Sequence, residues 1–144
     1  MKTLLLAIKA KIIADFTGLG DCEIVPEENI LPAAARFPFV GVKDGGIKRV
    51  EGIFNTLSRT LEVHFIVYQK ILKPEASIIG EGETPGVLDL VAQIHTLINH
   101  NLLNITGIIG AFCASEAPSE MVFDDKMGMI QKKKCTYVYE EEFG

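Results

Sequence analysis

Residues 59–72 have the sequence RTLEVHFIVYQKIL, in which apolar side chains recur at every second position. β-Branched and aromatic residues predominate and no Gly or Pro occurs before Pro74, so the pattern predicts one long strand with a buried face. The second face also carries apolar surface, from Ile66 and Tyr68, and we expect another element or another subunit to cover it. The predicted buried face consists of Leu61, Val63, Phe65 and Val67, and the opposite face of Glu62, His64, Ile66 and Tyr68.

Two amphipathic helices are predicted, one on each side of this strand in the sequence. The first spans about residues 3–16, where Thr3 can cap its start and Gly18 can end it. The second begins at Thr84-Pro85, because Thr is a favourable N-cap and Pro fits the first helical position. Apolar side chains recur at helical spacing in both: Leu5, Ile8, Ile12, Ile13 and Phe16 in the first, and Val87, Leu90, Val91, Ile94, Leu97 and Ile98 in the second.

Four further runs are typical of strands: residues 37–43, 106–114, 120–123 and 129–140. Asp44-Gly45-Gly46 predicts a tight turn after the first run, and an irregular loop is expected from there to Ser58. Residues 21–36 are expected to form a short extended piece and a loop, and residues 74–83 a connection. This order of elements predicts an α+β fold in one domain over residues 1–144, with a mostly antiparallel β-sheet and two amphipathic helices packed on one face.

The composition, 48% hydrophobic and 23% charged residues, is that of a globular protein. Lys9 and Lys11 break the opening apolar run and no run approaches the length of a membrane span, so we expect a soluble, cytoplasmic protein without a signal peptide. Three distant cysteines without a CxxC motif are expected to be free thiols. The net charge of −5 argues against a general nucleic-acid-binding protein.

The motifs that would indicate catalysis, a cofactor or a metal are missing from the sequence. The loop at residues 80–86 precedes a helix, but it matches no nucleotide-binding motif, and Glu81 and Glu83 would repel a phosphate. His95 and His100 are five positions apart on one helix, which is the wrong spacing for a shared ion. No Ser or Cys has a recognisable base nearby in sequence. We therefore expect neither an enzyme nor a cofactor or metal site.

Two groups of residues are candidates for contacts with other molecules. The basic run at residues 132–134 is interpreted as protection of a sheet edge, with contact to an acidic partner or nucleic acid as the alternative. Basic and aromatic side chains in the loop before the long strand, together with tyrosines of the last strand, are candidates for a subunit or tube interface, in which Arg and aromatic residues are enriched. These interface candidates are Lys48, Arg49, Phe54, Arg59, Tyr137 and Tyr139. Changing Phe54 or Tyr139 to Asp is expected to weaken assembly more than folding.

The order of several segments resembles that of the tail-terminator, or tail-completion, proteins of long-tailed bacteriophages and prophages. These segments are FPFVGVKDGG, RTLEVHFIVYQ, GEGETPGVLDLVAQI and KCTYVYEEE, and the similarity spans essentially the whole chain. The resemblance implies an α+β protein without catalytic activity or cofactor that forms a hexameric ring on the end of the tail tube. It also implies that residues 44–58 lie at the lumen or the tube-contacting side of that ring.

The partners implied by the resemblance are further copies of the chain, the tail tube protein and a head-completion or neck protein. Such a ring would end tube polymerisation, provide the head-joining surface and meet DNA only as it passes through the lumen. It would assemble in the cytoplasm of a bacterial host and then belong to the virion tail. Two alternatives are a ring component of a neck, a baseplate or a contractile secretion apparatus, and a small enzyme or ligand-binding domain of ferredoxin-like architecture.

Overall fold

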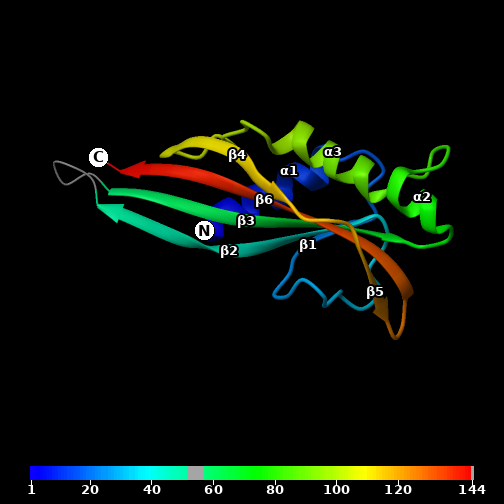
Figure 1. Cartoon of the computed structure of the whole chain (residues 1–144). Coiled ribbons are helices and arrows are strands. Elements are labelled where there is room, and N and C mark those ends of the chain that lie inside the picture. The colour runs from blue at the N-terminus through cyan, green and yellow to red at the C-terminus, as the bar shows by residue number, and fades with distance from the viewer. Residues whose placement is uncertain (52–56, 144) are drawn as a thin grey trace.

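The computed structural model describes residues 1–51 and 57–143 and contains one six-stranded sheet with three helices (Figure 1). The strand order is β1-β2-β3-β6-β4, and β5 also pairs with β6. Only β1 and β2 run parallel, so the sheet is mixed and mostly antiparallel, as predicted. The elements are α1 Lys2–Asp15, β1 Asp21–Ile24, β2 Phe39–Glu51, β3 Leu57–Lys70, α2 Pro74–Ile79, α3 Val87–Ile98, β4 Ile108–Glu116, β5 Glu120–Asp124 and β6 Gly128–Phe143.

Strand β3 is the long strand that the alternating pattern predicts, and it lies in the middle of the sheet between β2 and β6. The period of two places alternate side chains on opposite faces of the sheet. The face predicted to be buried packs under the helices, and all four of its residues are buried: Leu61, Val63, Phe65 and Val67. We call this side of the sheet the helix face and the other side the open face.

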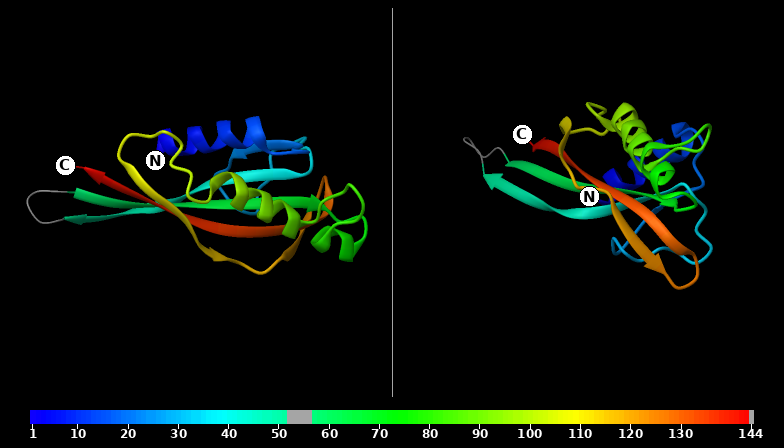
Figure 2. Two further views of the ribbon diagram at one scale, coloured as in Figure 1. Left: turned by 90° about the horizontal axis from the view of Figure 1, so that it is seen from above. Right: turned by 45° about the vertical axis from the view of Figure 1, so that its right-hand side comes forward.

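Helices α1 and α3 both cover the helix face, as predicted (Figure 2). The apolar stripe of α3 is buried against the sheet except at Leu97, which is partly buried. In α1 the predicted stripe is wrong at Ile13, which is 55% exposed, whereas Leu4 is buried in its place. The helix is slightly rotated relative to the predicted stripe because Leu4, Leu5, Ile8 and Ile12 make the side that meets the core.

The predicted helix starts are corrected by the structure. Helix α1 begins at Lys2, before Thr3, and α3 begins at Val87 with Gly86 as N-cap. The backbone N–H of Gly86 donates to the Asp89 carboxylate at 3.0 Å, and Thr84 instead closes a turn with Glu81. The connection predicted at residues 74–83 also contains a short helix, α2, which begins at Pro74. None of the helices in the described part of the chain is long and apolar enough to span a bilayer.

The irregular loop predicted from Asp44 to Ser58 is wrong over most of its length. Strand β2 continues to Glu51 and pairs with β3, with an irregularity in register between Asp44 and Ile47. Asp44-Gly45-Gly46 is therefore a β-bulge rather than a turn, and the positive φ of Gly46 accommodates the extra residue. The bulge interrupts the alternation of polar and apolar residues, which is why no strand period is visible in this part of the sequence. Phe54 lies outside the described residues.

Another segment of the same chain covers the open face of β3. Ile66 and Tyr68 are therefore buried by another element of this chain rather than by another subunit. Residues 25–37 cross beneath the sheet (Figure 1) and pack with Ile66 and Tyr68 in a second, smaller apolar cluster. The Tyr68 hydroxyl donates to the Glu28 carbonyl, and its ring packs against Phe39 with the centroids 5.7 Å apart. The apolar side chains on the open face of β3 are thus buried within the chain itself.

Candidate functional site

The ends of β2, β3 and β6 project beyond the helices as an elongated arm (Figure 1). Strand β1 pairs with β2 only from Phe39 to Val42, and no described strand pairs with the outer side of β2 beyond that point. Lys48 and Arg49 are exposed on this outer strand, and neither makes an ion pair with a described residue. The outer side of β2 is therefore a basic sheet edge with unpaired backbone groups, of the kind that pairs with another chain.

Arginines face each other across the two strands of this arm. Arg49 and Arg59 are direct partners in the register of β2 and β3, and Arg59 also forms an ion pair with Glu141 of β6. Like charges directly opposite each other are unfavourable in a sheet. Glu141 offsets the charge of Arg59, whereas the exposed Arg49 increases the positive charge of the β2 edge.

The opposite edge of the sheet is formed by β4 and β5 and has a different chemical character. Glu140 of β6 is exposed on the open face, and a Cβ added to Gly110 of β4 would lie 3.2 Å from its carboxylate. Because Gly110 has no side chain, the carboxylate of Glu140 extends over β4 toward the outer edge. The same edge also carries exposed apolar groups: Ile109, Phe112, Met121 and Phe123. The two sheet edges thus offer a basic surface and an acidic, apolar surface.

Tyr137 and Tyr139, which the sequence suggested for an interface, are both 0% exposed in the core on the helix face. Both fall on the inward-facing positions of β6, beside Val63 and Leu61 of β3. Neither ring is accessible to a partner, so the assignment of these two tyrosines to an interface is corrected. Tyr139→Asp would bury a carboxylate among apolar groups and is expected to unfold the chain rather than weaken assembly selectively.

The basic run at residues 132–134 does not protect an edge, because β6 has strands on both sides. Lys132 is only 4% exposed, and its ammonium lies 2.9 Å from a Glu28 oxygen and 2.6 Å from the Asn29 side-chain oxygen. Lys134 reaches the other Glu28 oxygen at 3.4 Å. Burial alone would raise the pKa of Glu28, but these two ammonium groups outweigh it and lower the pKa. Lys132 and Lys134 therefore hold residues 25–37 against the open face.

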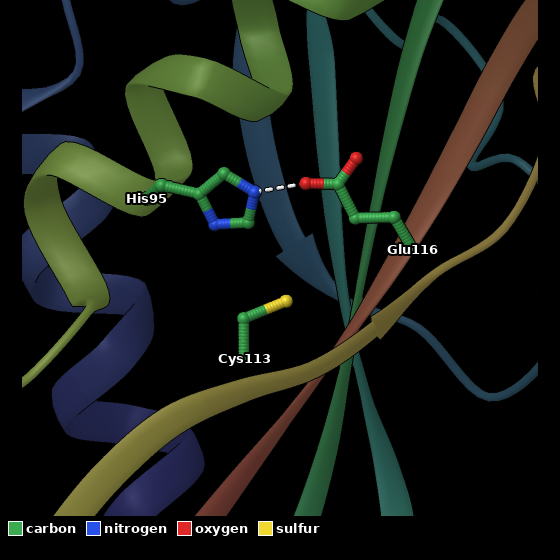
Figure 3. Close-up of side chains that lie close together, drawn as sticks. All are labelled: His95, Cys113 and Glu116. Carbon is green, nitrogen blue, oxygen red and sulfur yellow. Dashed lines mark hydrogen bonds and ion pairs between the residues drawn. The ribbon is translucent and has the colours of Figure 1, made fainter.

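A polar cluster lies on the helix face between α3 and β4 (Figure 3). His95 comes from the last turn of α3, and Cys113 and Glu116 come from β4; one ligand atom of each lies within 4.8 Å of the other two. One imidazole nitrogen, Nδ1, contacts the Tyr137 hydroxyl, and the other, Nε2, contacts the Glu116 carboxylate. The sequence predicts no metal site from the spacing of its histidines and cysteines, and that spacing could not reveal this cluster because its three residues come from two different elements.

A β-bulge creates this cluster. Residues three apart in a regular strand point to opposite faces, so Cys113 and Glu116 would normally diverge. The register shifts between Cys113 and Ser115, so that Cys113 pairs with Tyr137 and Glu116 with Cys135, both of which face the helices. The extra residue therefore returns Glu116 to the side of Cys113. No residue pattern in the sequence marks the bulge, which explains why the cluster was missed.

The cluster is not arranged for nucleophilic catalysis. Both nitrogens of His95 are engaged by Tyr137 and Glu116, and the Cys113 thiol lies 3.5 Å from the Ser115 carbonyl oxygen, to which it can donate. Burial, together with the Glu116 carboxylate, raises the pKa of the Cys113 thiol, which disfavours the thiolate. An activated nucleophile needs a free base and a lowered pKa. The arrangement fits ligand binding better than bond cleavage.

The glycine-rich loop at residues 80–86 borders a hollow of about 520 Å³ that also contacts Gln93. Three carboxylates line this hollow, those of Glu81, Glu83 and Asp89. The Asp89 carboxylate already accepts a hydrogen bond from the backbone N–H of Gly86, the N-cap of α3. The negative charge and the occupied amide both disfavour a phosphate. The geometry therefore agrees with a loop and cap rather than a nucleotide site.

Comparison with known proteins identifies the fold. No model of a known protein family and no curated protein matches the sequence. Among solved structures, the chain is similar to a chain of a structure described as the virion of a native gene transfer agent (GTA) particle. The TM-score is 0.62 with 12% sequence identity, and the match covers 97% of this chain and 95% of the other. The two chains share one fold over nearly their full lengths.

Proposed function

We propose that this chain is a structural protein of the tail of a phage or phage-like particle, in which six copies form a ring that caps the tail tube. The full-length fold likeness to a chain of a GTA virion carries this proposal. The sequence resemblance to tail-terminator proteins supports the finer role, in which the ring ends tube polymerisation and presents the head-joining surface. Its partners are then the tail tube protein and a neck protein, DNA passes through its lumen, and no catalysis is involved.

The two sheet edges support assembly into a ring. A ring with cyclic symmetry needs two different, complementary surfaces on each subunit. The outer side of β2 is basic and the β4 side carries Glu140 and exposed apolar groups, so the β2 edge of one copy can lie against the β4 edge of the next. Pairing at sheet edges keeps the faces of the two sheets continuous.

This arrangement predicts one particular charge pair between neighbouring copies. Lys48 and Glu140 both belong to the open face, because each pairs in register with Thr60. Within one chain two strand spacings, about 10 Å, separate their backbones, and Thr60 of β3 stands between them. Between copies the same two strand spacings would separate them, because β4 lies between β6 and the β2 of the next copy. Gly110 of β4 has no side chain to block the path, so the two side chains would meet over it, where complementary charge sets register and suppresses wrong contacts.

A charge exchange tests the proposed contact. Lys48→Glu should weaken self-association at least about 10-fold, because like charges across an interface cost several kcal/mol. Adding Glu140→Lys should restore it. Arg36→Glu, an equal change of charge on the exposed segment between β1 and β2, serves as the matched control. Light-scattering mass and negative-stain images provide the measurement. If Lys48→Glu self-associates as strongly as the control Arg36→Glu, the proposed edge contact is refuted.

A tube-length assay tests the proposed role. The chain is added to the tail tube protein of the same particle during tube polymerisation, and tube lengths are measured by electron microscopy. A terminator should shorten the tubes in proportion to its concentration and appear as a ring at one tube end. A ring that belongs to the neck or baseplate would leave tube length unchanged, and that result would overturn the terminator role.

A further inference from the structure

We propose that His95, Cys113 and Glu116 form a binding site for a divalent transition-metal ion of the Zn²⁺ type. The three residues offer an imidazole nitrogen, a sulfur and a carboxylate oxygen, with the ligand atoms within 4.8 Å of one another. This is a ligand set that Zn²⁺ takes, and three protein ligands leave a fourth tetrahedral position for water or a partner's group. Cys113 and Glu116 belong to the edge strand β4 but lie on its helix face, whereas the charge pair of the proposed ring lies on the open face, so the metal site does not depend on the proposed ring.

Tyr137 orients the histidine for this role. Its hydroxyl contacts Nδ1 of His95, and the two rings pack with centroids 5.7 Å apart, so Nε2 points toward Glu116 and Cys113 (Figure 3). Histidines that bind metals usually have the second ring nitrogen hydrogen-bonded, which fixes the tautomer and the ring orientation. With an ion on Nε2, the proton of the imidazole lies on Nδ1 and is donated to the Tyr137 oxygen.

The surroundings of Glu116 leave one oxygen for the ion. The ammonium of Lys133 lies 3.8 Å from Oε2 of Glu116 and 2.7 Å from the Ala117 carbonyl, which accepts a hydrogen bond from it. Oε1 is the oxygen that contacts His95. Glu116 is exposed and Cys113 is half-buried, so an ion can enter from solvent.

The proton balance of binding follows from the ligands. Zn²⁺ binds a neutral imidazole nitrogen, a carboxylate and a thiolate, so the Cys113 thiol loses its proton to solvent as the metal–sulfur bond forms. One proton is therefore released for each ion bound, so affinity rises with pH while the thiol is protonated in the free protein.

Titration of the reduced, chelator-treated chain with Co²⁺ and Zn²⁺ tests the site. We expect one ion per chain and, with Co²⁺, a thiolate-to-metal charge-transfer band. Cys113→Ser should abolish the band, and Glu116→Gln should weaken binding. Tyr137→Phe should lower the affinity by about 10–100-fold, as is typical of an outer-shell change. His100→Asn, which alters an exposed histidine outside the cluster, is the control and should bind as the wild type does.

Circular dichroism of each variant separates loss of the site from loss of the fold. Zn²⁺ should also raise the melting temperature of the wild type and of His100→Asn, but not of Cys113→Ser. The proposal is overturned if the folded, reduced wild type shows no charge-transfer band, or if the band persists in folded Cys113→Ser. Equal weakening by His100→Asn and Glu116→Gln would equally reject it.

Discussion

Tyr139 provides the sharpest test of the core packing. It is fully buried on the helix face of β6, and its hydroxyl has no hydrogen-bond partner among the described residues. Tyr137, two positions earlier on the same face, is equally buried, but its hydroxyl contacts His95. Burial raises the pKa of both phenols well above the usual value, so both hydroxyls stay protonated. Removing the hydroxyl of Tyr139 and removing that of Tyr137 should therefore change the free energy of unfolding in opposite directions.

The expected magnitudes follow from hydrogen-bond energetics. A buried polar group without a partner costs about 1–3 kcal/mol. Tyr139→Phe keeps the ring and removes that cost, so we expect the free energy of unfolding to rise by about 1–2 kcal/mol. Tyr137→Phe loses its hydrogen bond and leaves Nδ1 of His95 without this partner, so the free energy of unfolding should fall by about 0.5–1.5 kcal/mol.

Urea unfolding followed by circular dichroism measures both changes, and the m-value should stay constant because the exposed surface is the same. Melting temperatures should move by roughly 2–4 °C for each kcal/mol. Destabilisation by Tyr139→Phe, or a change of the same sign in both variants, would refute the reasoning. The hydroxyl of Tyr139 would then have a stabilising partner.

Two further predictions concern the contacts that hold the chain segments together. Glu28→Gln should lower stability at pH 7 by about 1–2 kcal/mol, because the buried Lys132 ammonium loses its carboxylate. Since the pKa of Glu28 is lowered in the folded state, its contribution is present above the unfolded pKa of about 4.3 and is lost as the pH falls through the folded pKa. Wild type and Glu28→Gln should therefore converge in urea unfolding at low pH, and a constant difference would contradict the assignment. Gly86→Ala should destabilise by about 1–3 kcal/mol or more, because its Cβ would lie 2.3 Å from the Ile78 carbonyl oxygen. Gly110→Ala, whose Cβ would meet the flexible side chain of Glu140, should change the melting temperature much less, and equal effects would count against this packing.

The fold class was predictable because its main signals are local. The period of two in β3 and the helical stripe of α3 each report which side of one element is buried, and both agree with the structure. The order of elements then limited the arrangement to a mostly antiparallel sheet with helices on one face. The free state of the three cysteines also follows from their distant positions.

The positions that the sequence misplaced depend on neighbours distant in the chain. The bulge after Asp44 breaks the alternation of β2, so the sequence pattern predicts a loop where the outer half of β2 pairs with β3. The lysines of β6 looked like edge residues, although Glu28 reaches them across about a hundred residues of sequence. Tyr137 and Tyr139 looked available for contacts because alternation alone does not say which face of β6 meets the helices.

Periodicity is a property of a single segment, so the residues alone predicted most of the elements and the inward side of the two most regular ones. Which side chains meet depends instead on how the segments pack against one another. Strand register, and the single extra residue that turns Glu116 toward Cys113 and His95, result from pairing between segments and leave no periodic trace in the sequence.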